Sequence, residues 1–110
     1  MEVTARAMSI RVSPFKIRLI LDEIRGKRIG EALAILHFMP SPTAKIVAKI
    51  VRSAAANAEN NYQIAPATLR VIKTWADAAP MLKRWKHHAR GRVGHVHKRS
   101  SHITVVVEEE

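Results

Sequence analysis

The sequence predicts an α+β domain in which three helices pack on a small three-stranded antiparallel sheet, with a long basic β-hairpin projecting between the last two strands. Three observations lead to this prediction. Two serine–proline pairs each open a segment with helical spacing of apolar residues, and a third such segment lies between them. Strand-like segments lie at the beginning and near the end of the chain, without the strand–helix repetition of a parallel sheet. A polycationic segment, MLKRWKHHARGRVGHVHKRSSH, separates the last two strands.

The composition limits the kind of protein that the chain can form and the partners that it can bind. Its 110 residues are typical of one domain, and the 47% apolar content is enough for a core. The net charge of +10 predicts a polyanionic partner, with nucleic acid as the first candidate. The chain has no cysteine, and no apolar run approaches the roughly 18 residues of a membrane span. We therefore expect neither disulfides nor a membrane partner.

The first strand and the first helix are predicted near the start of the chain. Alternation over residues 3–10 predicts a strand that carries Val3 and its alternate neighbours on one face. Ser13 can cap a helix, Pro14 suits the first helical position and Gly26 suits the end. The buried stripe of this helix is expected to comprise Ile17, Ile20, Leu21 and Ile24.

Two further helices are predicted in the middle of the chain. A short helix over about Ile29–Met39 is expected to stop at Pro40, and Ser41–Pro42 repeats the start signal. The longest helix then runs from about Pro42 to Asn60 and is expected to end in asparagines. Its buried stripe comprises Val47, Ile50, Val51, Ala54, Ala55 and Ala58. The small residues in this stripe favour close packing inside the domain.

The last two strands are predicted on either side of the polycationic segment, over Thr68–Trp75 and His102–Val107. The second of these strands alternates apolar residues and is expected to be an inner strand with one face on the helices. The core residues expected from the two strands are Leu69, Val71, Ile103, Val105 and Val107. These residues can close a core with the helices without any residue of the hairpin.

The polycationic segment, Met81–His102, contains seven lysines or arginines, five of the six histidines and no acidic residue. Gly91 and Gly94 near its middle indicate a hairpin, whose arms of about ten residues would reach about 30 Å. Because such a hairpin has few apolar side chains to bury, we expect a polyanion to order it. The single domain thus divides into a globular part, about residues 1–76 and 102–110, and an extended hairpin, about residues 77–101.

The same residues distinguish between several classes of function. Catalysis and a cofactor are not expected, because the acidic residues are scattered and no glycine-rich phosphate loop is present. A histidine-rich metal-binding protein is an alternative, since His95 and His97 would lie on one face of a strand. The surrounding cations would repel a divalent metal. A basic DNA-binding protein is a further alternative, but the segment has no recognition helix, and an arm with Trp85 suits irregular RNA better.

Three motifs resemble a universal ribosomal protein family of the large subunit, the one numbered twenty-two, in its bacterial or organellar type. The motifs are SPFKIRLILDEIRGK at residues 13–27, SAAANAENN at residues 53–61, and ARGR at residues 89–92 followed by KRSSHITVVV at residues 98–107. They occur in the order of the family, and the match runs nearly from end to end.

The resemblance implies a structural constituent of the large ribosomal subunit that binds 23S-type rRNA and aids early subunit assembly. It implies a globular part near the mouth of the polypeptide exit tunnel and a hairpin that lines the tunnel wall. The implied partners are large-subunit rRNA, neighbouring large-subunit ribosomal proteins and the nascent polypeptide. The implied location is a cytoplasmic or an organellar ribosome.

The candidate RNA-binding residues are cations, together with glycine, serine and histidine residues of the matching motifs. They are Arg11, Lys16, Arg18, Arg25, Lys27, Lys83, Arg84, Lys86, His88, Arg90, Gly91, Arg92, Lys98, Arg99, Ser101 and His102.

Overall fold

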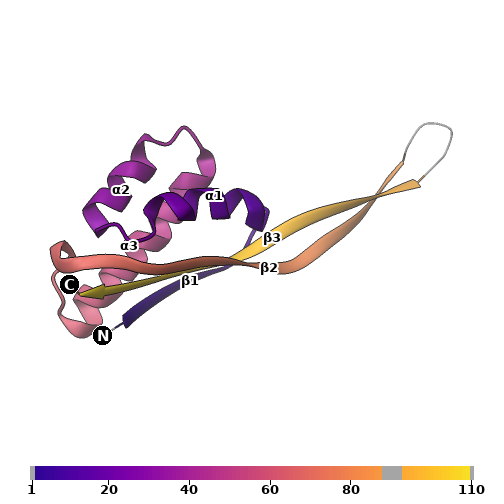
Figure 1. Ribbon diagram of the computed structural model, residues 1–110. Helices are drawn as coiled ribbons and strands as arrows, with labels where there is room; N and C mark the ends of the chain where they lie inside the picture. Colours follow the sequence, from indigo (N-terminus) through magenta and orange to yellow (C-terminus); the bar gives the residue numbers. More distant parts are fainter. Residues whose placement is uncertain (1, 88–92, 110) are drawn as a thin grey trace.

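A computed structural model of the chain describes the backbone of residues 2–87 and 93–109 and the side chains of residues 2–80 and 99–109. The elements are β1 (Glu2–Ile10), α1 (Pro14–Ile24), α2 (Ile29–Phe38), α3 (Pro42–Tyr62), a 3-10 turn (Pro66–Thr68), β2 (Leu69–His87) and β3 (Val93–Glu109). Three helices and a three-stranded antiparallel sheet confirm the predicted α+β class. The helices lie on one face of the sheet, and β2 and β3 project beyond them (Figure 1).

The sheet has the order β1-β3-β2, so β3 is the inner strand, as predicted. β1 pairs with β3 from Glu2↔Glu108 to Ile10↔Ser101. Beyond that point only β2 and β3 continue, as far as the pair His87↔Val93. The strands thus continue without a break past the expected ends at Trp75 and His102, and their pairing forms the arms of the predicted hairpin. Each strand satisfies the backbone groups of the other, so the ladder continues although the side chains change from apolar to basic.

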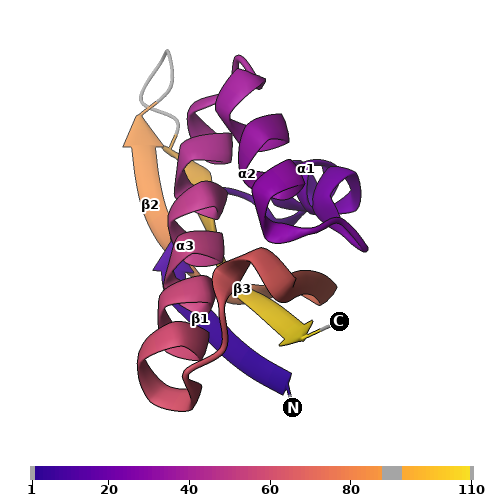
Figure 2. The same ribbon diagram turned by 90° about the vertical axis from the view of Figure 1, so that its left-hand side faces the viewer.

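The core lies between the helices and the three-stranded half of the sheet. All five core residues predicted from the last two strands have no exposed surface. The predicted stripes of α1 and α3 are also buried, and Ala44 and Ala48 extend the stripe of α3. Figure 2 shows the three helices packed next to one another. The helix α3 packs on β1, α2 and β3, and its small residues Ala54, Ala55 and Ala58 are buried, which confirms the expectation of close packing inside the domain.

The helix ends differ in part from the prediction. Ser13 occupies the N-cap position of α1, but its side chain makes no capping hydrogen bond, so proline alone marks this start. The helix α3 continues through its asparagines to Tyr62 and ends at Gln63, which adopts a left-handed φ of 56°. The N–H of Gln63 donates to Glu59 O at 3.1 Å, and Ile64 N–H donates to Ala58 O at 3.1 Å. These bonds satisfy the last carbonyls of the helix. The helix therefore continues through Asn60 and Asn61 and does not end at them.

Gly26 ends α1, as predicted, and ties the turn after it to the sheet. Its φ of +81° is a conformation that other residues rarely adopt. The N–H of Gly26 donates to Val71 O at 2.8 Å, and Val71 N–H donates to Lys27 O at 2.9 Å. The turn between α1 and α2 therefore covers the outer edge of β2 near its beginning.

The molecule is elongated because of the hairpin. Its principal extents are 61, 26 and 17 Å, and its radius of gyration is 16.9 Å. A compact domain of this length would have a radius of gyration of about 13 Å. Among the described residues, no helix is both long enough and apolar enough to cross a membrane.

Candidate RNA-binding surface

Three of the candidate cations line one hollow of about 390 Å³ at the root of the hairpin. Arg11 comes from the turn after β1, Lys16 from the first turn of α1, and Arg99 from β3 just beyond the end of β1. The other lining residues are Val12, Ser13 and Thr43. We call the three cations the root cluster. The surface joins elements that are far apart in sequence, which the sequence analysis did not foresee.

The electrostatics of this hollow favour an anion. No acidic residue lines it, and within the described part of the chain Arg11, Lys16 and Arg99 form no ion pair. The first turns of two helices, α1 at Lys16 and α3 at Thr43, also meet there. The N-terminal end of a helix carries a partial positive charge that adds to the charge of the cations. A phosphate group is the ligand that this arrangement suits.

Ser101 and His102 position the turn that carries Arg11. The Ser101 side chain has no exposed surface, and its hydroxyl donates to Val12 O at 2.6 Å. The Nδ1 atom of His102 accepts from the backbone N–H of Ser9 at 3.0 Å. Both were predicted from the sequence to contact RNA, which stays a prediction; the structure shows that the Ser101 hydroxyl and the His102 Nδ1 atom already bond the protein's own backbone. Their contribution to the surface is to hold Arg11 next to β3.

Arg18 and Arg25 are also used internally. The Nη2 atom of Arg18 donates to Ala76 O at 2.9 Å, and the Nη2 atom of Arg25 donates to Thr74 O at 2.9 Å. The Nη1 atom of Arg25 pairs with Asp22 Oδ1 at 2.6 Å. These bonds attach α1 to the middle of β2. Arginine offers five donors, so each side chain retains donors that can still reach a phosphate.

The remaining candidates differ in what the structure says about them. Lys27 is exposed in the turn between α1 and α2. The side chains of Lys83, Arg84, Lys86 and Lys98 lie outside the described residues, as do His88, Arg90, Gly91 and Arg92 entirely. The expectation that these eight residues contact RNA stays a prediction.

The histidines of the hairpin were the basis for a metal site. Among the residues whose side chains are described, no three histidine, aspartate or glutamate side chains are close enough to hold a metal ion. His95 and His97 lie outside that set. Asp77 pairs with His102 in the β2–β3 ladder, whereas His95 and His97 pair further out with Trp85 and Lys83, and its carboxylate accepts a hydrogen bond from Trp75 Nε1 at 3.2 Å.

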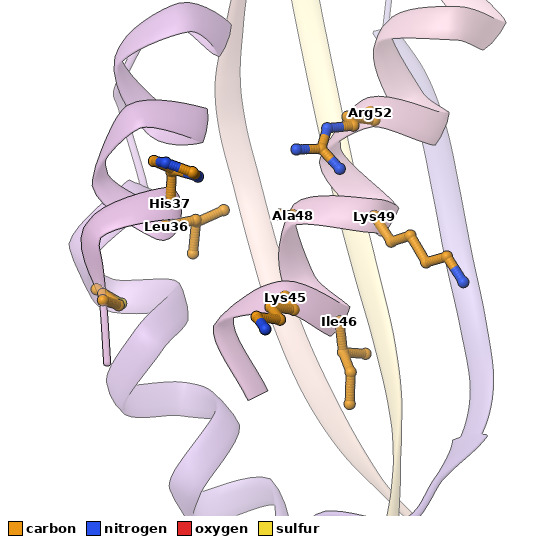
Figure 3. A pocket seen from close by; sticks show the side chains of 8 residues that line it. Leu36, His37, Lys45, Ile46, Ala48, Lys49 and Arg52 are labelled. Carbon is orange, nitrogen blue, oxygen red and sulfur yellow. The ribbon is translucent and has the colours of Figure 1, made fainter. Parts of the chain in front are cut away.

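A second basic surface was missed by the sequence analysis. Lys45, Lys49 and Arg52 line a groove between α2 and α3 together with His37 (Figure 3). Their spacing of four and three residues places them on one side of a helix. That spacing is visible in the sequence, but which neighbour they face depends on the packing of α2.

Comparison with known proteins agrees with these observations. A family model described as ribosomal protein L22p/L17e matches residues 5–108. The chain belongs to this family. It is 54% identical over 109 residues to the large ribosomal subunit protein uL22 of Dehalococcoides mccartyi, covering 99% of this chain and 100% of the relative. It is 51% identical to the uL22 of Thermomicrobium roseum, covering 99% of this chain and 92% of the relative.

Membership in the L22p/L17e family confirms the leading prediction about function. The chain is a structural constituent of the large ribosomal subunit and not an enzyme. Its location is the ribosome, and its partners there include rRNA and other ribosomal proteins. The metal-binding and DNA-binding alternatives are not favoured.

Proposed function

We propose that the root cluster binds phosphates of the large-subunit rRNA and marks the point where the hairpin enters the RNA. The observation that carries this proposal is the convergence of Arg11, Lys16 and Arg99 on one hollow without an acidic residue. Phosphate contacts fix the position and orientation of a protein on its nucleic acid. A cluster at the root of an arm is well placed to set the direction in which the arm leaves the domain.

The hairpin extends this contact away from the domain. The paired backbone from Ala79↔Ser100 to His87↔Val93 would span roughly 25–30 Å at about 3.3 Å per residue. This reach and the basic sequence of the segment support our proposal that the hairpin passes through rRNA to the wall of the exit tunnel. The nascent polypeptide is then a further partner. We also propose that the protein joins the subunit early in assembly, in a cytoplasmic ribosome of bacterial type.

The proposal can be tested by the salt dependence of RNA binding. Binding of the full chain to transcribed large-subunit rRNA is measured between 50 and 200 mM salt, in the presence of duplex DNA as competitor. If about six phosphates are contacted, the affinity should fall by orders of magnitude over this range. The triple variant Arg11→Gln, Lys16→Gln, Arg99→Gln should reduce the slope of log affinity against log salt by about 2–3, since each phosphate contact contributes about 0.7 on a single strand and about 0.9 on a duplex.

A matched variant distinguishes the root cluster from general charge. Arg6, Arg70 and Lys73 lie on the sheet face opposite the helices, as their alternation with buried residues shows. Replacing these three by glutamine removes the same charge and should change the slope by clearly less. Equal losses for the two triple variants, or complete competition by duplex DNA, would contradict a specific rRNA site at the root.

A further inference from the structure

The groove between α2 and α3 combines a cationic rim with an apolar floor. It has a volume of about 530 Å³. The rim carries His37 at the end of α2 and the cations of α3, and the floor includes Leu36, Ala48, Met39 and Ile46. In Figure 3 the side chains of His37 and Arg52 extend toward the gap between the helices, whereas Lys49 extends away from it. The volume is within the range of about 300–1,000 Å³ typical of small-ligand sites.

The cations along the groove lie close together on one helix, so they repel one another in the isolated protein. Lys45 and Lys49 are four residues apart on α3, and Lys49 and Arg52 are three apart. Like charges at these spacings repel each other and destabilise a helix. No acidic residue lines the groove, and these three cations form no ion pair within the described residues. Because no acidic residue of the lining balances Lys45 and Arg52, the groove is complementary to negative charge.

The apolar floor indicates more than a phosphate. A phosphate alone would be bound by the cations and needs no apolar contact. The faces of a nucleic acid base are apolar, and unpaired bases insert among apolar, aromatic and histidine side chains. At the edge of the groove, the His37 ring meets the Phe38 ring edge-on with 5.1 Å between centroids. The Phe38 side chain is 82% exposed, so its face is free to contact a base.

We propose that this groove binds an unpaired nucleotide of a single RNA strand, with the base on the floor and the adjoining phosphates at Lys45 and Arg52. The inference rests on the proposed rRNA-binding function, to which it adds a second and chemically different contact. Thr43 lines the root hollow and Lys45 lines the groove, so the two sites lie on different sides of the first turn of α3. An RNA that contacts both sites would pass the N-terminal end of this helix.

The experiment observes the groove directly through methionine methyl groups. Met39 lines the groove, and Met8 is an exposed reference on β1 with 62% of its surface accessible. The full chain with ¹³C-labelled methionine methyls is titrated with a uridine decamer, and with a self-complementary RNA duplex of the same length as a control. We expect the Met39 signal to shift saturably with the decamer, the Met8 signal to stay nearly constant, and the duplex to shift Met39 much less.

Two variants separate the base contact from the phosphate contact. Ala48→Leu fills the floor with aliphatic carbon without changing charge and should lower the decamer affinity read from the Met39 shift by about tenfold, with the salt slope unchanged. Arg52→Gln should reduce the salt slope by about 0.7, the contribution of one phosphate on a single strand. If Ala48→Leu does not fold, Ala48→Val gives the same comparison with a smaller added volume.

The outcomes distinguish a failure of the groove site from a failure of the proposed root site. The root-cluster triple variant should still show the Met39 shift, because the groove retains its own cations. An unmoved Met39 in wild-type protein that binds the decamer would overturn the nucleotide site while leaving the root site intact. Equal Met39 shifts with decamer and duplex would also overturn it. A Met39 shift produced only by an acidic peptide of glutamate and leucine would assign the groove to a protein partner instead.

Discussion

The two halves of the β2–β3 ribbon contrast in what surrounds them. In the near half, β1 and the helices cover the ribbon, and its inward side chains, such as Val71 and Val105, are fully buried. In the far half, beyond Ser100, β2 and β3 pair only with each other among the described residues. The same two strands therefore begin in a hydrophobic core and end as an arm. Backbone hydrogen bonds join the two strands in both halves, whereas the packing and the charge of the side chains differ between them.

The cations follow the same division. Arg18 and Arg25 donate to backbone carbonyls of β2 in the near half, where they attach α1 to the sheet. Arg99 stands where the near half ends and forms no ion pair within the described residues. We infer that the two arginines bonded to β2, Arg18 and Arg25, mainly contribute stability, while the root cluster and the cations beyond Arg99 mainly contribute binding. Four changes to the chain test this division, and their expected effects decrease in size.

Removing the arm should have the largest effect, and the effect should be on binding. Replacement of Lys83–His97 by Asn-Gly would close the ladder after the pair Leu82↔Lys98 with a dipeptide that suits a tight hairpin. Five lysines or arginines are lost, so RNA affinity near 100 mM salt should fall at least about 100-fold. The cooperative thermal transition should persist, since no core residue is removed. Calorimetry that finds no such transition would show that the arm is part of the folding unit.

Removing the internal arginine contacts should have the opposite result: the stability of the fold should fall more than the affinity for RNA. The double variant Arg18→Gln, Arg25→Gln loses hydrogen bonds to Ala76 O and Thr74 O. Because both side chains are partly exposed, we expect a loss of about 1–2 kcal/mol in the free energy of unfolding. Urea denaturation measures this loss. At a temperature where the variant is folded, its RNA affinity should fall less than that of the root-cluster variant; a larger fall would make these arginines primary RNA contacts.

Ser101→Ala tests how the root of the arm is held. The change removes the hydroxyl that donates to Val12 O; the Ser101 side chain has no exposed surface and the bond is partly buried. An unsatisfied buried acceptor costs about 1 kcal/mol. The turn with Arg11 should loosen, so chemical shifts of residues 11–13 should change and RNA affinity should decrease a few-fold. Val3→Ala is a useful control, since it destabilises the core at a distance from this turn and should leave the affinity of the folded protein unchanged.

The smallest effect on the free energy of unfolding is expected from weakening the surface ion pair between Asp22 and Arg25. Asp22→Asn weakens the contact between Arg25 Nη1 and Asp22 Oδ1, whose side chains are 45% and 61% exposed, respectively. Exposed pairs of this kind contribute less than about 0.5 kcal/mol. The bond from Arg25 to Thr74 O should remain. A loss as large as that of the arginine double variant would mean that Asp22 is needed to orient Arg25.

Much of the fold could be read from local patterns. The spacing of Ile17, Ile20, Leu21 and Ile24 identifies a helix and its buried face, because helical geometry brings these positions together whatever they pack on. Alternation of Ile103, Val105 and Val107 identifies an inner strand in the same way. The net charge and the cluster of cations around Gly91 similarly indicate a polyanionic partner without reference to any contact.

The role of each polar side chain required the tertiary structure. Ser101 is a candidate RNA contact by motif, but its hydroxyl is buried against Val12 O, which is 89 residues earlier in the chain. Arg11 and Arg99 are nearly as far apart in sequence and line one hollow only because β1 pairs with β3. Periodicity depends on neighbours within a few residues, and composition depends on none. A shared hollow or a buried hydrogen bond depends on which distant segments pack together, and that is decided by the fold as a whole.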